Sequence, residues 1–227
     1  MLELYIANKN YSSWSLRPWV LLKELKVPFV EHLVPFGDVS GWETYRKISP
    51  NGKVPCLVDG ETVVWDSLAI AEYLAERHPG VWPEHRVARA WARSAAAEMH
   101  SGFTELRNRC GMNCGVRVKL KDFPASLERD LGRLTGLWTD GLQRFGGPYL
   151  AGATFGAVDA FFTPVAFRVQ TYGLSLDPVA ARYAACLKDL PAMQDWYAAA
   201  LEERFRDAPH EAEVRDMGVV LEDLRAG

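Results

Sequence analysis

The sequence predicts an α/β domain followed by an all-helical domain. The short apolar stretches that we interpret as β-strands lie within the first 65 residues, where they alternate with helical patterns. After Pro83 the composition becomes rich in alanine, and apolar residues recur at helical spacing. We therefore expect the α/β domain at residues 1–78, a linker at 79–83 and the helical domain at 84–227.

The composition is that of an ordinary globular protein, since 48% of the 227 residues are hydrophobic and 24% are charged. The net charge of −3 gives no reason to expect nucleic-acid binding. No apolar run reaches the roughly 18 residues of a membrane span, and the start lacks the features of a secretory signal. We therefore expect a cytoplasmic protein with reduced thiols and no membrane partner. No spacing of cysteines and histidines is that of a zinc site, so we expect no metal.

The first 48 residues predict a strand, a helix and a second strand. Apolar residues alternate over residues 2–6 and recur at helical spacing from residue 15 to 25. A second strand is expected at 29–34, parallel to the first, because the helix between them provides the crossover. We expect residues 36–48 to be irregular, since they contain two glycines and no clear period.

The stretch from Ser49 to Leu74 predicts a strand, a turn, a strand and a helix. Residues 54–58 are apolar, and Asp59-Gly60 is a strong signal for a two-residue hairpin turn. The chain returns over residues 61–65, and Asp66-Ser67 then supplies oxygen-bearing side chains where a helix must start.

Pro55 is unusual in this stretch, because a proline inside a strand removes a donor from the ladder. One alternative is an edge-strand proline with no ligand. The other is a cis Val54–Pro55 bond, which is disfavoured by only roughly 0.5–1 kcal/mol. A cis bend would leave the Val54 amide and carbonyl free to pair with an extended peptide. The nearby Asp-Gly and Asp-Ser pairs favour this second alternative.

The same stretch resembles the glutathione-binding half of the thioredoxin-like domain of glutathione transferases. The resemblance implies that Val54–Pro55 is cis and that Val54 pairs with the cysteinyl backbone of glutathione. It also implies that Asp66 and Ser67 hold the γ-glutamyl group, since a helix N-terminus favours a carboxylate and Asp66 can meet the ammonium. Lys53 can reach the glycyl carboxylate, although a solvated loop lysine is an equal alternative. Glutathione transferases also have an α/β domain followed by an all-helical one, so the resemblance covers nearly the whole chain. It implies a thioredoxin-like domain followed by a helical bundle.

A serine-rich loop precedes the first helix, and residues 11–17 read Tyr-Ser-Ser-Trp-Ser-Leu-Arg. Three serines before a helix are more often caps than catalysts, and we expect Ser15 to be the cap. Ser12 and Ser13 then remain in the loop. The pattern Ser-Ser-x-Ser-x-Arg resembles that of zeta-class and bacterial serine-type glutathione transferases, which implies that Ser12 donates to the glutathione thiolate, with Ser13 as the alternative. Trp14 stands where the zeta class has cysteine, and this difference argues against zeta-type isomerase chemistry and disulfide exchange.

The helical half predicts one long helix over residues 84–111. On that helix His100 and Arg107 would share a face, and Arg107 or Asn108 could meet a carboxylate or another oxygen-rich group of a second substrate. We expect His100 to be structural, and Trp14 and Met112 to form an apolar wall. Further helices are expected at 124–145, 156–172, 178–187 and 192–203, with a charged tail from residue 206 that covers the surface.

One position departs from the family pattern in the helix expected at 156–172. Glutathione transferases have a capping box there, with Ser or Thr as the cap; here Asp159 is present but the cap is Gly156. We expect Asp159 to be buried and structural.

The expected function is a glutathione transferase that adds the thiol to a small hydrophobic or unsaturated electrophile. A glutathione-dependent cis-trans isomerase of the maleylacetoacetate type and a non-catalytic binding module are the alternatives. In each case glutathione is the substrate, cofactor or ligand. The resemblance also implies a homodimer.

Overall fold

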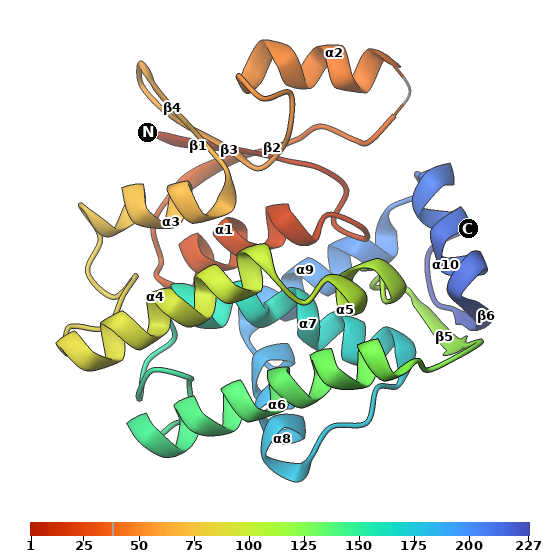
Figure 1. The fold of residues 1–227 in the computed structure, drawn as a ribbon. Helices are drawn as coiled ribbons and strands as arrows, with labels where there is room; N and C mark the ends of the chain where they lie inside the picture. Colours follow the sequence, from red (N-terminus) through yellow and green to blue (C-terminus); the bar gives the residue numbers. More distant parts are fainter. Residues whose placement is uncertain (38) are drawn as a thin grey trace.

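The computed structural model describes residues 1–37 and 39–227 of the chain, with the backbone alone for 39–42. Asp38, which falls within the stretch expected to be irregular, lies outside the described residues. A four-stranded sheet with its helices forms the amino-terminal part, and helices dominate the rest of the chain (Figure 1). The predicted combination of a thioredoxin-like region and a helical region is therefore confirmed.

The sheet has the strand order β2-β1-β3-β4. β1 (Leu2–Ile6) pairs in parallel with β2 (Phe29–Leu33), as predicted, and antiparallel with β3 (Cys56–Asp59). β4 (Thr62–Trp65) closes the hairpin with β3. Asp59 pairs with Thr62, so the central turn positions are Gly60 and Glu61 rather than Asp59 and Gly60. Gly60 has a φ of +61°, which suits the first central position of a two-residue turn.

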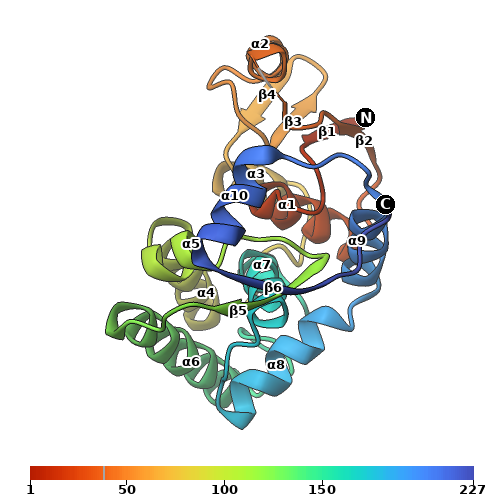
Figure 2. The ribbon, with the colours of Figure 1, turned by 90° about the vertical axis from the view of Figure 1, so that its right-hand side faces the viewer.

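Helices cover both faces of this sheet (Figures 1 and 2). α1 (Ser13–Glu24) and α3 (Ser67–Ala75) lie on the face toward the rest of the chain, and α2 (Val39–Ile48) lies on the other. The expectation of irregular structure over 36–48 was therefore wrong for residues 39–48. Tyr45 explains the helix: its ring is buried and its hydroxyl donates to the Val34 carbonyl at 2.7 Å, so packing outweighs the weak local pattern.

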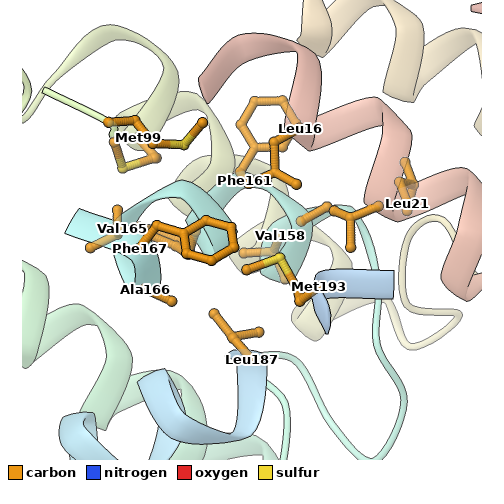
Figure 3. Packing of buried hydrophobic residues seen from close by; sticks show 14 of the residues in the cluster. Leu16, Leu21, Met99, Val158, Phe161, Val165, Ala166, Phe167, Leu187 and Met193 are labelled. Atoms are coloured by element: carbon orange, nitrogen blue, oxygen red, sulfur yellow. The ribbon is translucent and has the colours of Figure 1, made fainter. Parts of the chain in front are cut away.

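The helical part is built around α7 (Ala157–Tyr172), whose side chains are nearly all buried. α7 packs against α1, and also against α4 (Arg86–Ser101) and α8 (Pro178–Lys188). Figure 3 shows Leu16 of α1 close to Phe161 and Val158 of α7, with Met193 of α9 (Pro191–Glu202) beside them. One continuous core thus joins the sheet region to the helices. The other helices here are α4 (Arg86–Ser101), α5 (Thr104–Arg109), α6 (Ala125–Phe145), α8 (Pro178–Lys188), α9 (Pro191–Glu202) and α10 (Ala208–Met217).

The single long helix expected over 84–111 is two helices, α4 and α5, separated at Gly102 and Phe103. Phe103 has a φ of +54°, which no α-helix accommodates. A Cβ on Gly102 would lie 2.9 Å from the Glu98 carbonyl oxygen, so only glycine fits there. The break changes the direction of the chain before Arg107.

The carboxyl-terminal tail is more structured than expected. β5 (Val116–Leu120) and β6 (Gly218–Asp223) form an antiparallel pair, which the sequence did not predict (Figure 2). Arg225 secures the end of the tail by pairing with Glu211 of α10 and with Asp223, and only 3% of its side chain is exposed. The tail therefore brings α10 against the amino-terminal part of the chain instead of only covering the surface.

Asp159 is buried, as predicted, and accepts hydrogen bonds from three donors. Its carboxylate accepts from the Leu150 and Gly156 amides at 2.9 and 3.0 Å and from the Tyr183 hydroxyl at 2.7 Å. Burial raises the pKa of Asp159 to about 6, although these hydrogen bonds act in the opposite direction. A Cβ on Gly156 would lie 3.0 Å from the Val81 carbonyl oxygen, so the linker leaves little room for the usual Ser or Thr cap.

Candidate functional site

A hollow of about 290 Å³ lies beside the Val54–Pro55 bond, which is cis as predicted. We call it the Pro55 hollow. It brings together the loop before β3 and the start of α3, which the sequence predicted to act together. Its lining residues are Trp14, Asn51, Lys53, Val54, Pro55, Asp66 and Ser67.

Asp66 is the N-cap of α3, and its two carboxylate oxygens have different partners. Oδ1 accepts from the Leu68 amide at 2.8 Å, and Oδ2 lies 3.3 Å from Nε2 of His100. The side chain of Asp66 is 42% exposed, so its carboxylate is only partly covered. Burial lowers the pKa of His100, with Asp66 opposing and the nearby arginines reinforcing this shift. His100 therefore links α4 to the Pro55 hollow through Asp66.

Arg17 is a residue of this site to which the sequence did not assign a role. It is buried, its Nη1 donates to the Ser67 hydroxyl at 3.4 Å, and its guanidinium lies 4.1 Å from the centre of the Trp14 ring. No ion pair is formed by Arg17 within the described residues, and burial lowers its pKa. Its place as the last residue of the Ser-Ser-x-Ser-x-Arg pattern was the available signal. The Arg17 cation adds positive potential behind Ser67.

A larger cavity of about 470 Å³ adjoins the Pro55 hollow and shares Trp14, Lys53 and Val54 with it. Side chains from the serine loop, from the turn after α5 and from α10 meet there. The lining residues are Tyr11, Ser12, Ser13, Trp14, Phe36, Gly37, Tyr45, Gly52, Lys53, Val54, Arg107, Gly111, Met112, Arg168, His210 and Glu213.

Ser12, not Ser15, is the N-cap of α1. The helix starts at Ser13, two residues earlier than expected, and Ser12 Oγ accepts from the Ser15 amide at 3.4 Å. Ser15 is instead turned toward the end of β1, where its Oγ accepts from the Ala7 amide at 3.2 Å. The hydroxyls of Ser12 and Ser15 are 2.7 Å apart and hydrogen-bonded. Ser12 is thus both the helix cap and a wall of the large cavity.

Two other hydroxyls of this loop line the large cavity. Ser13 is half-buried at the first position of α1. The Tyr11 hydroxyl donates to Glu211 at 2.7 Å, and burial together with Glu211 raises the pKa of Tyr11 to about 12. The Tyr11 proton is therefore committed to Glu211, which leaves the serines as the available donors.

Two arginines provide positive charge in the large cavity. Arg107 lies over the Trp14 ring at 4.5 Å, and its Nη1 donates to the His100 carbonyl at 3.0 Å. Arg168 was not anticipated; it is buried, and its Nη1 donates to the carbonyls of Arg107 and Cys110. Burial lowers the pKa of Arg168 to about 10. Of the predicted residues on this side, Arg107 reaches the cavity, whereas Asn108 is exposed and lines neither hollow.

The cysteines are unpaired thiols, as expected. Cys56, next to Pro55, is fully buried, and burial raises its pKa. Burial also raises the pKa of Cys110 to about 12. Both groups are therefore protonated and poorly nucleophilic near neutral pH. Within residues 1–37 and 39–227 there is no group of three metal-ligating side chains and no helix long and apolar enough to cross a membrane.

Comparisons with known proteins agree with this geometry. Residues 11–77, which contain the serine loop and the Pro55 hollow, match the family model for the glutathione S-transferase N-terminal domain. The chain is 30% identical to a zeta-class glutathione S-transferase from Euphorbia esula, over 72% of this chain and 73% of that protein. It is 28% identical to a probable maleylacetoacetate isomerase from Caenorhabditis elegans, over 83% of this chain and 89% of that protein.

The fold is similar to a crystal structure of a glutathione transferase homolog from Burkholderia with bound glutathione. That match has a TM-score of 0.63 and 22% identity, and covers 88% of this chain and 97% of the other. The family model therefore covers the segment that carries the serine loop and the Pro55 hollow, and the solved structure shares the fold of nearly the whole chain. The chain belongs to the glutathione transferase family of enzymes.

Proposed function

We propose that this enzyme binds glutathione along the Pro55 hollow, activates its thiol with Ser12 and transfers the sulfur to an electrophile in the large cavity. The observation that carries the proposal is the continuity of the two hollows through Trp14, Lys53 and Val54. A tripeptide paired with Val54 has its cysteine at that junction, next to the start of α1.

The two ends of glutathione have suitable partners in the Pro55 hollow. The γ-glutamyl carboxylate lies at the N-terminus of α3, where the Ser67 hydroxyl, the free amides and the Arg17 charge favour an anion. The γ-glutamyl ammonium meets Oδ2 of Asp66, the oxygen that does not cap the helix. Lys53 is exposed at the rim and pairs with the glycyl carboxylate.

Ser12 is the donor that we propose for the thiolate. A hydroxyl proton rotates, so the bond between the two serines can also run from Ser15 to Ser12. Ser15 keeps its acceptor role for the Ala7 amide in that arrangement, and the Ser12 proton becomes free for the sulfur. A charge-assisted hydrogen bond of this kind is worth about 1.5–3 kcal/mol, or one to two units of thiol pKa. Ser13 is the alternative donor, because it lines the same cavity.

The electrophile is proposed to be a small hydrophobic or unsaturated compound. Met112 and Phe36 supply apolar wall, and Arg107 and Arg168 suit a carboxylate or carbonyl group. Conjugation ends with a thioether, whereas isomerisation ends when the thiol is expelled again. The relatives named as probable maleylacetoacetate isomerases and the two arginines support the isomerase alternative. Trp14, in the position of the zeta-class cysteine, favours conjugation.

We also propose a cytoplasmic homodimer, as expected from the family. The exposed apolar side chains of Val63 and Trp65 on β4 and Val87 on α4 support a surface for a second copy. Sedimentation velocity tests this assembly, and a monomer throughout the micromolar range would contradict it.

The test of the proposed function is glutathione binding by calorimetry, combined with conjugation assays against halogenated aromatics, epoxides and maleyl-type acids. Wild-type enzyme should bind glutathione and turn over at least one of these classes. A Pro55-hollow variant, Asp66→Ala, should lose binding while remaining folded. Absence of glutathione binding by the folded wild-type protein would contradict the proposal.

A further inference from the structure

An aspartate–histidine pair at the start of α10 has no place in the function proposed so far. Asp207 is buried and is the N-cap of α10. Its Oδ2 accepts from the His210 amide at 3.3 Å and lies 2.5 Å from Nδ1 of the His210 ring. The carboxylate therefore fixes both the backbone and the imidazole of His210.

The His210 ring is held on both sides and lines the large cavity. Its centroid lies 5.1 Å from that of Tyr11 and 5.0 Å from that of Phe36. Tyr11 directly precedes Ser12, so the imidazole stands beside the serine loop on the wall formed by α10. Within the part of the chain that the structure describes, Nδ1 is bonded to Asp207 and no protein partner is found for Nε2.

This arrangement is that of an oriented acid–base catalyst. A carboxylate that accepts the Nδ1 proton leaves the lone pair of Nε2 free, and it stabilises the imidazolium that forms when Nε2 takes a proton. His210 combines a buried carboxylate on one ring nitrogen with a place on the wall of the large cavity.

We propose that His210 is the proton carrier of this enzyme, and that Asp207 is its positioning residue. The inference rests on the proposed function, since it assigns the proton transfers that accompany attack by the thiol. Nε2 takes the proton as the S–H bond of glutathione breaks, and Ser12 donates its hydrogen bond to the resulting sulfur anion.

With an unsaturated carbonyl compound, the sulfur forms a bond to the β-carbon. The π pair of the C=C bond becomes a double bond between the α-carbon and the carbonyl carbon, and the π pair of the C=O bond moves to the oxygen, which gives the enolate. The imidazolium then gives its proton to the α-carbon as the enolate collapses. One S–H has been added across one C=C bond, and His210 is neutral again. No further reactant is needed.

Charged groups of both signs surround the proposed carrier. Asp207 lies on its own helix, and Glu213 of the same helix lines the cavity. Arg107 and Arg168 line the cavity as well, where they suit the enolate oxygen that develops while His210 returns the proton. Tyr11, Tyr45 and Lys53 are the other titratable groups of the lining.

The test compares His210→Gln with His32→Gln, using the unsaturated acid or ketone that the wild-type enzyme turns over fastest. His32 is a matched control, because it also pairs with a carboxylate, Glu3, and stacks on a tyrosine, Tyr5, but lines neither hollow. General acid–base groups contribute roughly 10²–10⁴-fold, so His210→Gln should lower kcat by about 100-fold or more. The Kd for glutathione should change by less than about threefold, and His32→Gln should behave as wild type.

Two further variants keep the test decisive. His210→Ala opens a space between Tyr11 and Phe36, and added imidazole should restore part of kcat in a saturable way. Asp207→Asn retains a good helix cap, so it should fold, yet it should lose roughly tenfold in kcat and gain nothing from imidazole.

Wild-type kcat in His210→Gln, or in Asp207→Asn if the histidine variants do not fold, would overturn the inference. It would also be overturned if the wild-type enzyme turned over no unsaturated carbonyl compound. Glutathione binding and turnover of halogenated aromatics would still stand in that event, so failure of this inference is distinguishable from failure of the proposed function.

Discussion

The hydroxyl oxygens of Ser12 and Ser15 lie 2.7 Å apart at the start of α1; both residues are buried, and Ser12 also lines the wall of the large cavity. The bond joins the cap of the helix to a side chain anchored on the Ala7 amide at the end of β1. The Ser12 hydroxyl, which we assign to the thiolate, is thereby held by α1 and by the end of β1.

Ser12→Ala should lower kcat/KM roughly tenfold to 100-fold, because a charge-assisted hydrogen bond contributes about 1.5–3 kcal/mol. It should also lower the free energy of unfolding by about 1 kcal/mol through loss of the helix cap. Ser13→Ala is the control and should affect both quantities much less. Steady-state kinetics and urea denaturation give the two values; a larger kinetic loss in Ser13→Ala would move the catalytic role to Ser13.

Asp66→Asn tests the charge at the start of α3 without removing the cap, because the asparagine oxygen can still accept from the Leu68 amide. The lost attraction for the γ-glutamyl ammonium should raise the Kd for glutathione about tenfold. Asp177→Asn makes the same change at the cap of α8 and should leave the Kd unchanged. Equal Kd values for the two variants, measured by calorimetry, would contradict the role of Asp66.

Arg107→Gln should raise KM about tenfold for an electrophile that carries a carboxylate, and much less for its neutral ester. The guanidinium lines the large cavity and has no carboxylate partner within the described residues. Arg93→Gln breaks a surface pair with Glu72 and serves as the control. If the acid and its ester respond equally to Arg107→Gln, the residue does not recognise the carboxylate.

Asp159→Ala should lower the free energy of unfolding by at least about 1–3 kcal/mol, because it leaves two buried amides and the Tyr183 hydroxyl without their acceptor. The folded-state pKa of Asp159 is raised from 3.8 to about 6, so between these values the folded state binds more protons than the unfolded state. The stability advantage of the wild type over Asp159→Ala should therefore decrease as pH rises from 4 to 6. Urea titrations of both proteins between pH 4 and 6 measure this difference in the free energy of unfolding. A difference that grows with pH would show that the pKa of Asp159 is lowered instead.

The sequence was sufficient for the parts of the site that depend on local chemistry. The cap at Asp66 follows from the residue type, because aspartate is a preferred helix cap. The cis Val54–Pro55 bond and the buried Asp159 were predicted with the help of the family resemblance as well. Ser12 was predicted to face the glutathione thiol, and it lines the large cavity. The predicted helix cap was Ser15, whereas the observed cap is Ser12, because the apolar period that marks the helix begins only after its first turn.

Long-range packing decided most of the features that the sequence did not predict, and α2 depends on the burial of Tyr45. The break at Gly102 is an exception, because the Glu98 carbonyl that crowds a Cβ there belongs to the preceding turn of the same helix. Arg168 and His210 reach the large cavity only because α7 is central and the tail folds back over the serine loop. No local pattern in the sequence encodes these approaches.

The pKa of the thiol of bound glutathione tests the central claim most directly. It is measured from the ultraviolet absorbance of the thiolate during a pH titration of the enzyme–glutathione complex, in the wild type and in Ser12→Ala. A free thiol titrates near about 8.5, and the account predicts a decrease of one to two units in the wild type that Ser12→Ala largely abolishes. A thiol that titrates at its free value in the wild type, or at the same lowered value in both proteins, would contradict it.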